Sequence, residues 1–146
     1  MTDKKRSSAI FINGGAGRVI ASIPALEKFQ EENPDDNFVV VCEGGTDFFK
    51  GHPTLYARVY DHWHKGLFTD KLKERELITP EPYRVWEYYN QLCSIAQAYD
   101  IAINKKGLRE LHKPKIKLNK EEMIFGKKLV DEVREKTTKD KVVVFQ

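Results

Sequence analysis

The sequence has 146 residues, 40% hydrophobic and 32% charged, with a net charge of +3, which is the composition of one globular domain with a hydrophobic core. The small positive charge does not support a nucleic-acid partner, and no apolar run approaches the length that crosses a membrane. The polar start, residues 1–6, lacks the apolar segment of a secretory signal. Cys42 and Cys93 fall inside predicted core elements, so we expect two buried thiols and a cytoplasmic, reducing location.

The chain opens on a predicted strand, a glycine turn and a predicted helix. An apolar run covers 9–13, and a helical pattern covers 17–32. In open α/β sheets, ligands bind beyond the carboxyl ends of strands, where glycines allow close approach and helix N–H groups favour anions. We therefore predict a ligand-binding loop made of Asn13, Gly14, Gly15, Ala16, Gly17 and Arg18.

A second glycine turn follows the predicted second strand, 38–42. Its first residues, Glu43 and Gly44, are expected to join the same ligand site. Glu43 also stands where a dinucleotide-binding domain carries a ribose-binding carboxylate, so a dinucleotide is one alternative ligand. The third glycine of that fingerprint is missing, and no Gly-Lys-Ser/Thr of a P-loop follows the first turn. A turn that only joins strand to helix is the other alternative.

Three polar residues around the second turn are candidate catalytic bases: Glu43, Asp47 and His52. Polar residues are expected in loops in any case. Further along, His62 and His64 lie beside Asp61 and would place two imidazoles on one strand face, as metal ligands require. No third ligand has convincing spacing, so we predict no metal site.

The middle of the chain alternates between predicted strands and helices. The pattern predicts a strand at 58–61, a weak helix at 67–76, a rigid connection at 79–82, a long helix at 83–98 and a strand at 100–104. We expect the strands at 9–13, 38–42 and 100–104 to be parallel neighbours. This order predicts an α/β, Rossmann-like parallel sheet with helices on both faces. Within the long helix, Tyr88 and Tyr89 fit the core face, whereas Trp86 lies off it and is a candidate for contacting a sugar.

The last third of the chain is predicted to lie outside this sheet. The lysine-rich stretch 113–117 is interpreted as a solvated linker, with contact to an acidic partner as the alternative. Asn119 is expected to cap a helix, with Glu122 in capping-box spacing. The final strand, 141–146, has no turn or helix after it. We therefore expect a first domain at 1–113 and, at 114–146, a linker, a helix and the first strand of a C-terminal domain that lies outside this sequence.

With these elements in order, the chain resembles the N-terminal half of a GT-B glycosyltransferase, and most of all glycosyltransferase family 9, the heptosyltransferase-like group. Its first helix matches the family segment at Ser22, Pro24, Ala25 and Leu26. The segment 118–122 and the apolar strand after it resemble the family's crossing into the C-terminal domain. The whole chain is also similar to glycosyltransferase-like proteins of tailed phages.

The resemblance implies transfer of a sugar from an activated sugar nucleotide, with this chain as the acceptor-side half. It implies a sugar or sugar-phosphate ligand, no cofactor, and a missing C-terminal domain that holds the donor; it gives no oligomeric state. Family members carry a catalytic Asp where this chain has Arg18. Because an arginine cannot accept a proton but can clamp a phosphate, the alternative is a non-catalytic anion- or sugar-binding module, or a phage structural component.

Overall fold

The structure is a computed structural model that describes residues 6–144. The chain divides into two compact units, Met1–Ile116 and Lys117–Gln146. We refer to them as the first and the second unit.

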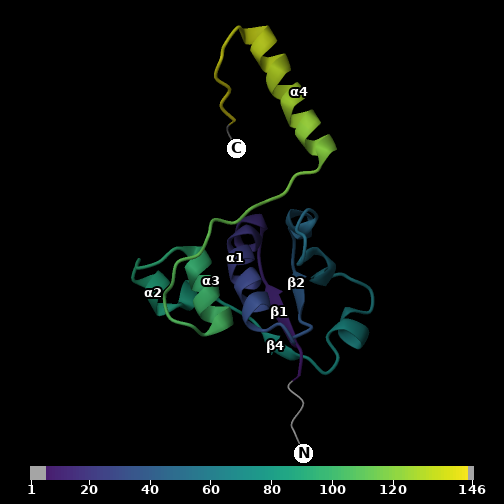
Figure 1. Cartoon of the computed structure of the whole chain (residues 1–146), viewed down its shortest axis with the longest axis vertical. Helices are drawn as coiled ribbons and strands as arrows, with labels where there is room; N and C mark the ends of the chain where they lie inside the picture. Colours follow the sequence, from purple (N-terminus) through teal and green to yellow (C-terminus); the bar gives the residue numbers. More distant parts are fainter. Residues whose placement is uncertain (1–5, 145–146) are drawn as a thin grey trace, which may run out of the picture. The chain divides into compact units, whose positions relative to one another are not determined.

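The first unit is built on a parallel sheet, which has four strands in the described residues (Figure 1). These strands are β1 (Ser8–Ile12), β2 (Val39–Cys42), β3 (Val59–Asp61) and β4 (Glu76–Ile78). They lie in the order β3-β2-β1-β4, and each neighbouring pair is parallel. Because this is the order of the first four strands of a Rossmann fold, the predicted α/β Rossmann-like class is confirmed.

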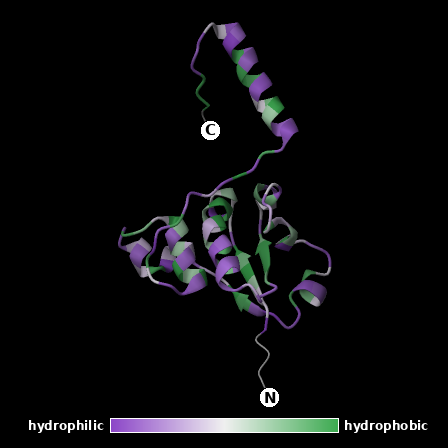
Figure 2. Cartoon of the chain, viewed as in Figure 1, coloured by the Kyte–Doolittle hydropathy of each residue, from purple (hydrophilic) through white to green (hydrophobic). Residues whose placement is uncertain are grey.

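Helices cover both faces of the sheet, to different extents. On one face, α1 (Ala16–Glu32) and α3 (Ile95–Asn104) lie side by side over the strands (Figure 1). Their buried side chains share one core with the inward residues of β1 and β2. Within the described residues, the helical cover of the other face is one π-helical turn, Leu67–Lys71; its Leu67, together with Leu72, packs with Ala9, Val39 and Val41. β1 and β2 are therefore buried on both faces, which is why both are continuous apolar runs (Figure 2).

The prediction of a strand at 100–104 is wrong, because these residues form the end of α3. The helix begins at a capping box in which Ser94 and Gln97 satisfy each other's backbone N–H groups. From there Tyr99 and Ile103, four residues apart, face the core together. The isoleucines and alanine of 100–104 resemble a buried strand, but the capping box starts a helix at Ile95 that continues through these residues.

The predicted helix at 83–98 is also wrong in its extent. The segment contains a 3-10 turn, Pro82–Arg84, the short α2 (Trp86–Tyr89) and only the beginning of α3. The chain turns between α2 and α3, where Gln91 adopts φ +60°, a left-handed conformation that ends a helix.

The predicted weak helix at 67–76 is shorter than expected, and a strand follows it. Only Leu67–Lys71 is helical, and β4 begins at Glu76. β4 pairs with β1, with Ser8 opposite Glu76 and Ile10 opposite Ile78. The third parallel neighbour in the sheet is therefore β4, not 100–104.

The second unit contains α4 (Lys120–Thr137). The predicted cap is confirmed, because Asn119 and Glu122 form a capping box. Figure 2 shows hydrophobic and hydrophilic residues interleaved along this helix. Residues 141–144, where the last strand was predicted, are in no strand, and positions 145 and 146 lie outside the described residues.

Candidate ligand site at the carboxyl edge of the sheet

The two glycine turns meet at the carboxyl edge of the sheet. They follow β1 and β2, which are parallel neighbours, and Glu43 Oε2 accepts a hydrogen bond from the Gly14 N–H at 2.6 Å. Gly14 has φ +87°, a left-handed conformation that favours glycine. A Cβ atom at this position would lie 2.8 Å from Arg18 Cδ. The structure thus brings together the predicted loop and Glu43 of the second turn.

Helix α1 begins inside this loop without a side-chain cap. Gly15 is its N-cap residue, and none of the described side chains accepts a hydrogen bond from the first-turn N–H groups in the manner of a cap. The first turn also has no acidic residue. The N-terminus of a 17-residue helix therefore leaves N–H groups and a partial positive charge at the carboxyl edge of the sheet.

Arg18 lies against this loop and is held by residues from two later segments. Its Nε donates a hydrogen bond to the Tyr99 hydroxyl at 2.9 Å, and its Nη2 pairs with Glu81 Oε1 at 3.2 Å. Its guanidinium carbon also lies 5.1 Å from the centre of the Tyr83 ring. The position beside the glycine turn agrees with the sequence prediction. An arginine in an open cleft is expected to be largely accessible to water, but only 19% of the Arg18 side chain is exposed.

The charge state of these groups follows from their surroundings. Burial raises the pKa of Tyr99 and outweighs the opposite effect of Arg18, so its hydroxyl stays protonated and accepts the Arg18 Nε–H. Burial lowers the pKa of Arg18, but the contacts with Tyr99 and Glu81 outweigh it and leave that pKa raised. Arg18 is therefore a fixed positive charge beside the loop.

The three candidate bases have different surroundings. Glu43 is at the loop, where it holds Gly14. Asp47 forms an ion pair with Lys50 at 2.7 Å. His52 has both ring nitrogens engaged, because Nε2 lies 2.7 Å from Glu27 Oε1 and Nδ1 accepts two backbone N–H groups. His52 therefore has no ring nitrogen left for a substrate. Of the two carboxylates, Glu43 is the one that contacts the glycine loop.

The histidines after β3 do not assemble a metal site in the described part of the chain. His62 Nδ1 lies 3.8 Å from Asp61 Oδ1, and the His64 ring makes an edge contact with Tyr60. Across residues 6–144, no group of three histidine, cysteine, aspartate or glutamate side chains is placed to hold a metal ion.

Sequence patterns do not point to Glu81, Tyr83 or Tyr99 as site residues. Glu81 and Tyr83 come from the segment after β4, and the strand order brings that segment beside the loop after β1. The sequence signal that could have pointed to Glu81 is its acidic side chain within the predicted rigid connection at 79–82. Tyr89, expected in the core, is 80% exposed, whereas Trp86 is exposed as expected.

The two cysteines are free thiols with different environments. Cys42 is fully buried, and burial with a contribution from Asp61 raises its pKa to about 12. Cys93 is partly exposed, contrary to expectation, and burial followed by the charge of Glu87 raises its pKa less strongly. Neither thiol is activated as a nucleophile.

Comparisons with protein-family models, with curated proteins and with solved structures give no match to this chain. Within residues 6–144, no helix combines the length and the apolar composition needed to span a bilayer.

Proposed function

We propose that this chain binds a phosphorylated sugar at the glycine loop, as the acceptor-side half of a sugar-transferring protein. The observation that carries the proposal is the uncapped N-terminus of α1 beside the charged Arg18. Backbone N–H groups, a helix dipole and a guanidinium at one point form a site for a phosphate. The resemblance of the Ser22–Leu26 segment to family 9 glycosyltransferases is the reason for proposing a sugar as the phosphate carrier.

One of the two polar contacts of Arg18 is weak enough for an anion to displace. Its Nε is occupied by Tyr99, but the bond from Nη2 to Glu81 is long, at 3.2 Å, and Glu81 is 38% exposed. A phosphate brings a stronger, charge-assisted partner than this exposed carboxylate. We expect the ligand to displace Glu81 while Tyr99 keeps the guanidinium in place.

Chemistry at this site requires a base for the acceptor hydroxyl. Arg18 cannot serve, and Glu43 is the carboxylate at the loop. If the chain takes part in transfer, Glu43 is the residue we propose for proton removal. Because Arg18 stands where the resembling family carries a catalytic Asp, a second candidate function is a module that binds the sugar phosphate without turnover.

The proposal is tested by calorimetric titration of the full chain with glucose 1-phosphate and with a sugar nucleotide. Arg18→Ala is expected to weaken binding by about 1–3 kcal/mol, or roughly 5- to 150-fold, which is the contribution of a hydrogen bond to a charged group. Arg134→Ala, in the second unit, is the matched control and should leave the affinity unchanged.

Because Arg18 contacts Tyr99 and Glu81, we also expect Arg18→Ala to lower the melting temperature, contrary to what an exposed arginine would do. The titrations are therefore run well below the variant's transition, checked by circular dichroism. Equal affinity of the wild type and a folded Arg18→Ala would contradict the proposal. Tighter binding of a nicotinamide dinucleotide than of either sugar ligand would favour the dinucleotide alternative.

A further inference from the structure

A pocket of about 430 Å³ lies in the first unit, in the segment that connects β4 to α3. It is lined by Tyr83, Tyr88, Tyr89, Gln91 and Cys93. We call it the tyrosine pocket. Its volume lies within the range of small-molecule sites.

The lining of the tyrosine pocket is aromatic and uncharged. Three of its five residues are tyrosines, the others are an amide and a thiol, and none of the described residues that line it carries a formal charge. Burial raises the pKa of Cys93, so its thiol is neutral at physiological pH. This lining suits a ligand with an apolar face and several hydroxyl groups, because tyrosine offers both a ring face and a phenolic hydroxyl.

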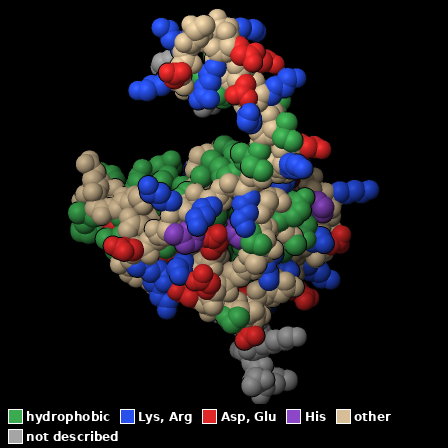
Figure 3. Space-filling view, turned by 45° about the horizontal axis from the view of Figure 1, so that its top comes forward, with side chains coloured by type: hydrophobic (Ala, Val, Ile, Leu, Met, Phe, Trp, Pro, Cys, Tyr) green, Lys and Arg blue, Asp and Glu red, His purple; other side chains and the backbone are tan. Residues whose placement is uncertain are grey.

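The aromatic side chains around the tyrosine pocket are unusually exposed. Of the lining tyrosines, Tyr89 is 80% exposed and Tyr83 is 47% exposed, and Trp86, in the same short helix as Tyr89, is 66% exposed. Figure 3 shows hydrophobic side chains gathered on the left of the first unit, on the side where Figure 1 places α2. Aromatic side chains exposed together in this way are available to contact a ligand.

The tyrosine pocket adjoins the glycine loop through Tyr83. The ring of Tyr83 lines the pocket and also lies under the guanidinium of Arg18, at 5.1 Å. A ligand in the pocket is therefore next to the residue proposed to bind phosphate.

The ring geometry distinguishes between ligand classes. The rings of Tyr83 and Tyr88 meet at 65° with centres 5.6 Å apart, which forms a corner rather than the parallel pair that sandwiches a nucleobase. A cationic ligand would face the positive charge of Arg18 beside Tyr83, a charge that the Glu81 carboxylate offsets in part. An uncharged sugar ring would meet neither obstacle, because its C–H face could pack on one tyrosine ring while its hydroxyls bond to the phenols and the Gln91 amide.

We propose that the tyrosine pocket is a saccharide subsite that holds an uncharged sugar ring beside the glycine loop. This inference rests on the proposed function for the identity of the ligand, and it adds where the sugar ring lies. The test uses uncharged sugars, so its result does not depend on phosphate binding at Arg18.

The experiment measures protection of Cys93 from iodoacetamide in the full chain at mildly alkaline pH. Cys42, fully buried and with its pKa near 12, is the internal reference that stays unmodified while the protein is folded. The probes are the methyl glycosides of glucose, galactose and mannose, and N-acetylglucosamine. If a bound sugar shields the Cys93 thiol, only protein with an empty pocket is modified. A sugar at ten times its Kd should therefore slow the modification of Cys93 about tenfold.

Tyr89→Ala should abolish this protection. The variant should still fold, because the Tyr89 side chain is largely exposed. Tyr56→Ala removes an exposed tyrosine outside the tyrosine pocket and should keep the protection. The inference is overturned if none of the four sugars protects Cys93, or if adenosine or choline protects it and the sugars do not. Protection that survives in Arg18→Ala, with glucose 1-phosphate failing to bind the wild type, would support the tyrosine pocket and refute the phosphate site.

Discussion

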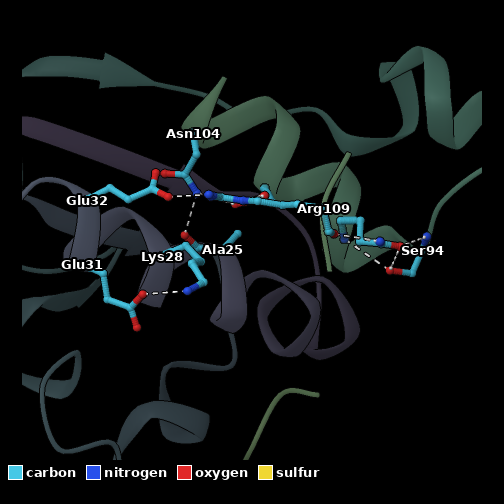
Figure 4. A network of polar contacts seen from close by, with 9 residues as sticks. Ala25, Lys28, Glu31, Glu32, Ser94, Asn104 and Arg109 are labelled. Atoms are coloured by element: carbon cyan, nitrogen blue, oxygen red, sulfur yellow. Dashed lines mark hydrogen bonds and ion pairs between the residues drawn. The ribbon is translucent and has the colours of Figure 1, made fainter. Parts of the chain in front are cut away.

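At the scale of single residues, a bidentate ion pair joins the buried Asp100 to Arg109 in the first unit. The Asp100 side chain is only 1% exposed, and its two oxygens lie 2.5 Å from Arg109 Nε and 2.7 Å from Nη2. Arg109 also pairs with Glu32, and Asn104 donates to Asp100 and to the Ala25 carbonyl (Figure 4). The bonds to Asp100 and Glu32 hold the pKa of Arg109 well above its usual value. This network fixes the segment after α3 against α1.

Arg109→Ala should therefore destabilise the first unit by about 3 kcal/mol, because it leaves the Asp100 carboxylate buried without its cation. Urea unfolding followed by tryptophan fluorescence measures this, since Trp63 and Trp86 both lie in the first unit. Lys28→Ala, which breaks an exposed ion pair with Glu31 in the same unit, should leave the urea midpoint nearly unchanged because water screens that pair. Equal midpoints for Arg109→Ala and Lys28→Ala would contradict the role given to this network.

The candidate site was predictable from the sequence only where its residues are local. The glycine turn, Arg18 and Glu43 follow directly from the ends of two apolar runs. The partners of Arg18 are 63 and 81 positions away, at Glu81 and Tyr99, and no local pattern connects them. Their role depends on where β4 and α3 lie in the fold.

At the scale of elements, the two capping boxes show when a local signal is decisive. Asn119 and Glu122 stand before an isolated helical pattern, and the predicted α4 follows. Ser94 and Gln97 make the same motif before α3, but they lie inside a longer run of apolar residues at helical spacing, which hides the start of a new helix. β4 was not predicted because three mostly exposed residues give no apolar run.

Ser94→Ala should cost the first unit about 1 kcal/mol, the usual contribution of an N-cap side chain. Asn119→Ala removes the matching cap of α4 and should reduce helical circular dichroism without moving the tryptophan unfolding midpoint, because the two units are separately compact. Thermal and urea unfolding monitored by both signals separate these effects. If Asn119→Ala shifts the tryptophan midpoint as much as Ser94→Ala does, the two units are not independent.

At the scale of the whole molecule, the strand order positions the candidate site. Parallel pairing of β1 with β2 follows from two buried apolar runs separated by a helix, and the sequence predicts it. The position of β4 on the other side of β1 creates the point where the strand order reverses, and in open α/β sheets ligands bind at this point. The sequence pattern predicted that 100–104 is the third strand of the sheet, and it therefore gave no indication that residues after β4 reach the glycine loop.

The most direct test of phosphate binding at the glycine loop is an NMR titration of the full chain with glucose 1-phosphate that observes the backbone amide and arginine Nε–H signals. We expect the largest shift changes at Gly14, Gly15, Ala16 and Gly17 and at the Nε–H of Arg18, because these groups surround the uncapped N-terminus of α1. Shift changes that leave the loop unaffected and gather on the exposed lysines of α4 would contradict the account.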